Sequence, residues 1–148
     1  MNFTTVRVKK LHPDAILPTR GSAAAAGADL YALPGAAITV SPGQTVWIHT
    51  GLAMEIPAGY VALIFARSGL ACRQGLAPAN KVGVIDADYR GEFIIVLHNH
   101  AAEEVTVHGG DRIAQMVIVP CLTADFVEAD ELSETIRGSG GFGSTGTN

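Results

Sequence analysis

A chain of 148 residues suits a single domain with its own hydrophobic core. Charged residues make up only 16% of the chain and apolar residues 48%, so a subunit interface is expected to cover part of the apolar surface. The net charge of −4, without any Lys/Arg-rich stripe, argues against a duplex nucleic-acid partner. No apolar run reaches the roughly 18 residues that a membrane-spanning helix needs.

The N-terminal residues and the cysteines bear on the cellular compartment. Residues 1–4 lack the basic-then-apolar pattern of a signal peptide. Cys72 and Cys121 are the only cysteines, and their spacing is unlike that of a metal site. We therefore expect a cytoplasmic protein whose two thiols are reduced and buried.

Short β-prone runs alternate with Gly/Pro turns along the chain. Turn signals lie at residues 34–35, 42–43, 57–59 and 109–111, and the predicted strands are 45–50, 60–66, 93–98, 104–107 and 112–119. One stretch, Ser68–Gln74, predicts about two turns of helix, with Ser68 as its N-cap and Gly75 closing its C-terminus. This rhythm predicts an all-β sandwich, jelly roll or barrel.

Two segments before residue 75 are candidates for chemistry. Residues 26–31, Ala-Gly-Ala-Asp-Leu-Tyr, set Asp29 among apolar neighbours, where a buried carboxylate needs partners. Residues 66–71, Ala-Arg-Ser-Gly-Leu-Ala, join a strand to the short helix. Arg67 and the Ser68 hydroxyl could bind a phosphate there, although an ordinary capped junction explains the same residues equally well.

Two later segments carry further polar side chains. Residues 80–91 are predicted as a hairpin whose turn holds Asp86, Asp88 and Tyr89. An aspartate in a turn is usually turn chemistry, but beside a pocket it could deprotonate a water molecule. Residues 110–115, Gly-Asp-Arg-Ile-Ala-Gln, open a strand, with a possible Asp111–Arg112 contact.

The C-terminal residues are unlike the rest of the chain. From Gly138 onward, five of eleven residues are glycine, so this tail cannot pack a core and is expected to be mobile unless a ligand orders it. Its backbone N–H groups could gather around an anion, with Arg137 supplying charge and Phe142 a ring that can stack. The chain thus divides into a β-rich domain, residues 1–136, and a Gly-rich arm, residues 137–148.

The order of these five segments resembles the five ordered motifs of the trimeric dUTPases, over about residues 26–146. The resemblance implies a jelly-roll-like β-clip subunit with one short helix, in a homotrimer whose active sites are shared between chains. It implies hydrolysis of dUTP to dUMP and pyrophosphate, which limits uracil in DNA and supplies dUMP for thymidylate synthesis. Mg²⁺ would be held mainly by substrate phosphates and water, with no protein metal cage.

The resemblance also implies roles for individual residues. Asp86 matches the general base, Tyr89 the residue beneath the deoxyribose, and Asp29 a supporting residue. The residues that match phosphate contacts are Arg67, Ser68, Gly69 and Gln115. Those that match the uracil pocket are Asn80, the backbone at Gly83, Val84 and Ile85, and the return strand near Ile94. Those that match an arm closing over the substrate are Arg137, which would meet the γ-phosphate, Phe142, which would cover the uracil, and Gly143, Ser144 and Thr145.

Three alternatives stay open on the sequence. A dCTP deaminase-related enzyme would share the fold and nucleotide class, but the Gly-rich arm and the Tyr89 segment favour dUTP. A non-catalytic nucleotide-binding regulator of the same fold would have no use for Asp86. A sugar-binding jelly roll would leave the segments around Arg67 and Arg137 unexplained.

Overall fold

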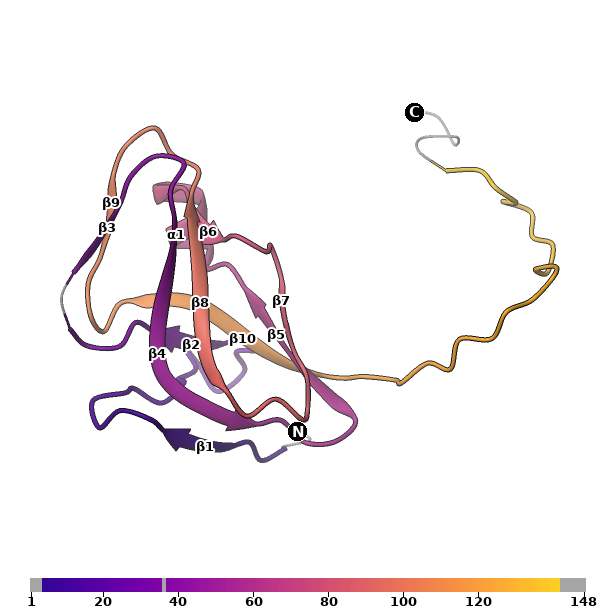
Figure 1. The fold of residues 1–148 in the computed structure, drawn as a ribbon, viewed down its shortest axis with the longest axis horizontal. Helices are drawn as coiled ribbons and strands as arrows, with labels where there is room; N and C mark the ends of the chain where they lie inside the picture. The colour runs from indigo at the N-terminus through magenta and orange to yellow at the C-terminus, as the bar shows by residue number, and fades with distance from the viewer. Residues whose placement is uncertain (1–3, 36, 142–148) are drawn as a thin grey trace.

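The computed structural model describes residues 4–35 and 37–141, and within them it shows ten strands and one short helix (Figure 1). This mostly-β architecture with a single helix confirms the predicted fold class. The elements run, in chain order, β1 (Arg7–Lys10), β2 (Ala28–Tyr31), β3 (Ile38–Val40), β4 (Thr45–Glu55), β5 (Tyr60–Phe65), α1 (Ser68–Gln74), β6 (Leu76–Pro78), β7 (Gly83–Ile85), β8 (Glu92–Asn99), β9 (Val105–Val107) and β10 (Arg112–Pro120).

Two four-stranded antiparallel sheets form the body of the molecule. One has the strand order β1-β4-β8-β6 and the other β2-β10-β5-β7, while β3 and β9 form a separate two-stranded ribbon. Every strand pair is antiparallel, and most pairs join strands far apart in the sequence. The site described below follows from these non-local pairings.

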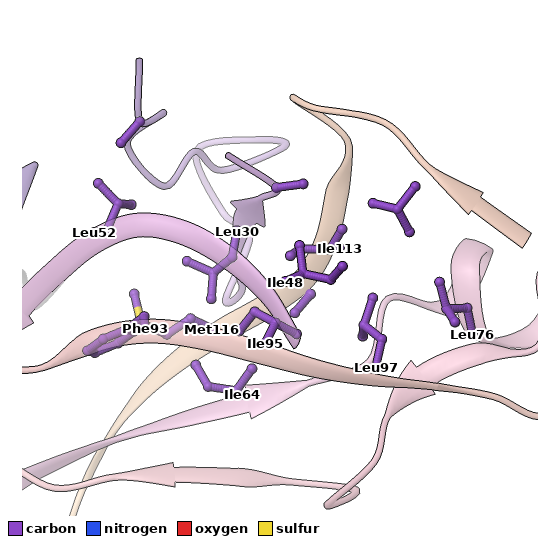
Figure 2. Packing of buried hydrophobic residues seen from close by; sticks show 14 of the residues in the cluster. Leu30, Ile48, Leu52, Ile64, Leu76, Phe93, Ile95, Leu97, Ile113 and Met116 are labelled. Carbon is purple, nitrogen blue, oxygen red and sulfur yellow. The ribbon is translucent and has the colours of Figure 1, made fainter. Parts of the chain in front are cut away.

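The core lies between the two sheets (Figure 2). Along β8 the buried and half-buried residues alternate strictly, which places Phe93, Ile95 and Leu97 on the inner face. They pack with side chains of the other sheet, among them Leu30 and Ile64. Residues 93–97 are all apolar in the sequence, so the alternation of burial is a property of the fold. Burying each inner side chain contributes about 1.5–3 kcal/mol and stabilises the sandwich.

The short helix confirms one predicted cap and corrects the other. Gly75 adopts a left-handed conformation at φ 71° and closes α1, as expected. Ser68 is not the N-cap: that position belongs to Arg67, whose backbone is extended and whose side chain makes no capping hydrogen bond. The Arg67 guanidinium is instead turned towards Asp29.

The thiols are placed differently from the prediction, because both cysteines are exposed. Cys72 lies on α1, a helix that buries none of its residues in the single chain. Cys121 follows β10, where the chain has left the core. The expectation of buried thiols was therefore wrong, since neither position belongs to a face that packs against the sheets.

The predicted hairpin over residues 80–91 was also wrong. β7 pairs with β5 in one sheet, whereas β8 pairs with β4 and β6 in the other. The turn itself is present, because the Tyr89 amide donates to the Asp86 carbonyl at 3.2 Å. The chain thus turns at Asp86 and crosses from one sheet to the other instead of folding back on itself.

After Pro120 the described residues up to 141 form neither helix nor strand, and they run away from the body (Figure 1). This tail carries large apolar side chains in full exposure, with Leu122 96%, Phe126 93% and Ile136 111% exposed. In the described part of the chain, no helix has the length and apolar character to cross a membrane.

Candidate active site

Arg67 and Arg112 both contact Asp29 at one end of the β2-β10-β5-β7 sheet, and these three residues form the arginine cluster. Arg67 donates through Nε to Asp29 Oδ1 at 2.7 Å, and Arg112 Nη1 lies 3.4 Å from Asp29 Oδ2. The Asp29 side chain is only 15% exposed, so the two cations compensate for its burial. Arg112 contacts Asp29 and not Asp111, the partner that had been expected. The Asp111 carboxylate instead accepts a hydrogen bond from the His108 amide at 2.7 Å.

Gln115 lies beside this cluster through strand register. On β10 it stands opposite Asp29 of β2 and Phe65 of β5. Its side-chain amide donates to the Ala66 carbonyl at 2.8 Å, directly before Arg67. Gly27 makes room for it, since a Cβ at Gly27 would lie 2.6 Å from Gln115 Oε1. Three segments separated in sequence therefore meet at one end of the sheet.

A cavity of about 350 Å³ opens next to this cluster. Three arginines line it, Arg67, Arg112 and Arg73, with Gly69 from the first turn of α1. Ser68 is exposed beside Gly69. The surplus of cations suits a polyanion such as a chain of phosphates. Arg112, in the same segment as Gln115, was expected only to contact Asp111. Arg73 was not expected at this site, because no sequence signal marks it.

A second cavity, of about 100 Å³, lies between β7 and β8. All five residues expected to form a pyrimidine pocket line it, namely Asn80, Gly83, Val84, Ile85 and Ile94. Gly83 is buried against Ile64, and a Cβ added to Gly83 would come within 3.1 Å of that side chain. A larger residue at position 83 would therefore disturb this wall of the cavity.

Two strand edges face this cavity. Among the described strands, β7 is the last of its sheet and pairs only with β5. On β8, the Val96 carbonyl accepts from the Ala79 amide at 2.9 Å, and backbone groups alternate between the two edges of a strand, so those of Ile94 point the same way. The β6 register begins only at Leu97, so in the described structure no strand lies beside Ile94 on that edge.

The turn after β7 presents Asp86 and Tyr89. Asp86 is exposed, and no ion pair engages it within the described residues. Tyr89 is 41% exposed, its hydroxyl donates to the Glu92 carbonyl at 3.0 Å, and its ring lies 6.2 Å from that of Phe93. A carboxylate free to act as a base and a fixed aromatic ring thus flank the end of β7.

Comparisons with known proteins identify the family. The family model described as dUTPase matches residues 13–146. The chain belongs to the dUTPase family. A relative from Desulfitobacterium hafniense, named deoxyuridine 5'-triphosphate nucleotidohydrolase, is 51% identical over 149 aligned positions that cover 99% of each protein. A relative of the same name from Syntrophotalea carbinolica is 48% identical, again over 99% of each protein.

Solved dUTPase structures share the fold. A mutant of the Staphylococcus bacteriophage 80alpha dUTPase, solved with dUpNHpp, superposes with a TM-score of 0.90 at 29% identity, over 98% of this chain and 100% of that one. A dUTPase mutant from phage phi11 of S. aureus, described with a structural Mg(II) ion, has a TM-score of 0.81 at 27% identity, over 88% and 100%.

In this member of the dUTPase family the two cavities are separate and share no lining residue. Asp29 stands opposite Gln115, which stands opposite Phe65, whereas Asp86 follows the residue opposite Ala62. Asp86 is therefore about four residues along the strands and three strands across from Asp29. At roughly 3.3 Å per residue and 4.8 Å per strand, on the order of 20 Å separates them.

The arm of this dUTPase-family chain is described only in part. Arg137 is exposed, and its Nε donates to the Gly140 carbonyl at 2.9 Å. The other arm residues named from the sequence, Phe142, Gly143, Ser144 and Thr145, lie outside the described residues. In the described tail, Arg137 contacts none of the groups that line either cavity.

Proposed function

We propose that this chain hydrolyses dUTP to dUMP and pyrophosphate, with Mg²⁺ bound to the substrate. The cavity between the edges of β7 and β8 carries the proposal. A uracil ring offers a donor and acceptors along one edge, and a strand edge offers the complementary N–H and C=O groups. The backbone from Gly83 to Ile85 would read the base as a partner strand, and the Asn80 amide would add side-chain hydrogen bonds.

The triphosphate would bind at the arginine cluster. Asp29 fixes the Arg67 guanidinium through Nε, and none of the described residues accepts a hydrogen bond from Nη2, which would bind phosphate oxygens. Ser68, Gly69 and Gln115 would supply neutral donors around it. Arg137 of the arm would add a cation at the γ-phosphate. Because each phosphate oxygen would meet a donor already in place, binding would need little reorganisation.

Asp86 would act as the general base. Its carboxylate would accept a proton from a water molecule whose oxygen attacks the α-phosphorus. A bond forms between that oxygen and the α-phosphorus while the bond from the α-phosphorus to the bridging oxygen breaks. The bridging oxygen leaves with pyrophosphate, and dUMP remains. No covalent intermediate with the protein is required.

The side chains around the site are compatible with a cation that binds as a complex with the substrate. Mg²⁺ prefers oxygen ligands, and within the described residues no three His, Cys, Asp or Glu side chains gather closely enough to hold a metal. As the resemblance implies, we expect the ligands of the ion to be phosphate oxygens and water. Bound there, Mg²⁺ would neutralise phosphate charge, while the chain's own arginines bind the remaining oxygens.

The separation of Asp86 from the arginine cluster favours active sites that are shared between chains. A base must lie within a hydrogen bond of the attacking water, so it cannot act across about 20 Å. A homotrimer in which one chain supplies the base pocket, another the arginine cluster and a third the arm would remove this conflict. The exposed apolar side chains of the tail, such as Leu122 and Phe126, would then be covered by neighbouring chains.

Pyrophosphate release from a panel of nucleotides tests the proposal. With Mg²⁺, dUTP should be hydrolysed, while dCTP, dTTP and UTP should be poor substrates, and chelation by EDTA should suppress turnover. Ammonia release from dCTP would identify a deaminase instead. Tight nucleotide binding without turnover would identify a regulator.

A further inference from the structure

Glu92 connects an irregular part of β4 to Tyr89. Its Oε1 accepts the Gly51 amide at 2.7 Å, and its Oε2 lies 2.8 Å from His49 Nδ1. Its backbone carbonyl accepts the Tyr89 hydroxyl at 3.0 Å. β4 therefore holds the Glu92 side chain in place, and the Glu92 main-chain carbonyl holds the Tyr89 hydroxyl in place.

The irregularity in β4 explains why a carboxylate is needed there. The β4–β8 register shifts between His49 and Ala53, and Gly51 has a positive φ of 69°. A Cβ on Gly51 would lie 2.9 Å from Leu33 Cδ1, so the position has neither the space nor the conformation for another residue. At this bulge the regular strand ladder is interrupted, and the Glu92 carboxylate supplies the acceptor for the Gly51 amide.

Tyr89 depends on this segment for its orientation. The ring is 41% exposed, so close packing does not enclose it. It rests over Gly91, where any Cβ would collide with its hydroxyl group, and among the described residues its side chain hydrogen-bonds only to the Glu92 carbonyl. A small displacement of residues 91–92 would therefore move the hydroxyl anchor and tilt the ring.

We propose that Glu92 and His49 are positioning residues that set the discrimination between deoxyribose and ribose by holding Tyr89 in place. This inference rests on the proposed function, in which Tyr89 occupies the space that a 2′-hydroxyl would need. His49 orients the Glu92 carboxylate, the carboxylate fixes the strand start, and the Glu92 carbonyl fixes the ring. Neither His49 nor Glu92 lines either of the two cavities.

The ionisation of Glu92 agrees with this arrangement. Burial opposes the charged form, but the hydrogen bonds from His49 and the Gly51 amide outweigh it, and the pKa of Glu92 is lowered. The side chain is 21% exposed, so the charged carboxylate sits mostly out of solvent and accepts from both partners at once.

The test compares kcat/KM for dUTP with kcat/KM for UTP in His49→Ala, Glu92→Ala and Glu92→Gln. The dUTP/UTP ratio should fall about 10-fold in both alanine variants, since small misplacements of a contact group have effects of this order. Glu92→Gln still offers an oxygen to the Gly51 amide and should retain most of the ratio. His49 is 58% exposed, so its alanine variant should fold even where Glu92→Ala does not.

His98→Ala is the matched control. His98 lies on β8 and loses an equivalent hydrogen bond, from its Nδ1 to Thr45 Oγ1 at 2.8 Å, on the same strand pair but away from Tyr89. Its ratio should equal that of the wild type. If His49→Ala and Glu92→Ala lower only the melting temperature and leave the ratio unchanged, the positioning role is overturned.

Tyr89→Ala separates this inference from the proposed function. If Tyr89→Ala relaxes the ratio but the His49 and Glu92 variants do not, Tyr89 selects the sugar without their help, and the inference fails alone. If Tyr89→Ala also leaves the ratio unchanged, the proposed role of Tyr89 fails, and the inference falls with it.

Discussion

Arg67 and Asp29, 38 residues apart in the sequence, form an ion pair of 2.7 Å between Arg67 Nε and Asp29 Oδ1. The pair is largely buried, with 26% and 15% of the two side chains exposed. Asp29 lies opposite Gln115 on the neighbouring strand, so the sheet register itself sets where the guanidinium lies. The pairing of β2 with β10 thereby positions the Arg67 side chain, which is proposed to bind phosphate.

Asp29→Asn should weaken this positioning. The amide keeps the size of the side chain but lacks the charge, so the hydrogen bond to Arg67 weakens and about 2 kcal/mol of stability is lost. We expect kcat/KM for dUTP to fall about 10- to 100-fold. Steady-state kinetics and urea denaturation measure the two effects. Arg7→Ala is the control, because it removes an exposed ion pair, 78% and 38% exposed, and should change neither.

Asp86→Asn should abolish turnover while dUTP still binds. The amide keeps the shape of the side chain but cannot accept the proton of the attacking water, so kcat should fall about 100-fold or more. Calorimetry with a non-hydrolysable dUTP analogue measures the binding that remains. Asp88→Asn, in the same turn, should retain near wild-type kcat. A wild-type kcat in Asp86→Asn would remove Asp86 from the mechanism.

The sequence pattern predicts some strands closely, one only in part, and others not at all. The predicted strands 60–66, 93–98, 104–107 and 112–119 match β5, β8, β9 and β10 within one or two residues at each end, whereas the predicted strand 45–50 covers only about half of β4. β1 has the sequence Arg-Val-Lys-Lys and is mostly exposed, so its pairing with β4 leaves no apolar pattern. An edge strand such as β1 is a strand because it pairs with a distant part of the chain, and the residue pattern carries no information about that pairing.

The sequence named several residues that line the two cavities but did not predict how they are arranged. It predicted a hairpin around Asp86 because strands that are neighbours in sequence usually pair. Here β7, before the turn, pairs with β5, and β8, after the turn, pairs with β4. The separation of strands β7 and β8 creates the cavity, and only the tertiary fold determines it.

Glu92 should make stability depend on pH in the acidic range. Despite its burial, hydrogen bonds from His49 and the Gly51 amide lower the pKa of Glu92 below its usual 4.5. Its stabilising contribution is therefore complete above pH 4.5 and is lost as the pH falls through the lower, folded-state pKa. The difference in melting temperature between wild type and Glu92→Gln should be constant near neutral pH and shrink below pH 4.5. Glu128→Gln, on the exposed tail, should match the wild type throughout.

Phe142→Trp should report closure of the arm. A tail with five glycines loses about 1–2 kcal/mol per residue when its backbone is fixed, so only strong contacts with the triphosphate can order it. In a Trp47→Phe background, which removes the only native tryptophan, a non-hydrolysable dUTP analogue with Mg²⁺ should change the fluorescence strongly. Because dUMP lacks the outer phosphates, it should change the signal little. Equal responses to both would show that the γ-phosphate does not close the arm.

Mixed oligomers should recover activity that neither parent chain has. One parent carries Asp86→Asn and the other lacks all residues after Arg137, so each is expected to be inactive alone. About 20 Å separates Asp86 from Arg67 and Asp29 within one chain, and we propose that a working site combines chains. Some hybrids would then contain an intact Asp86 turn and an intact arm at the same site. Activity should therefore reappear after the two are refolded together. A truncated chain that also carries Asp86→Asn is the control and should restore nothing. Hybrids that are demonstrated by mass spectrometry but remain inactive would mean that the Asp86 turn and the arm of each site come from the same chain.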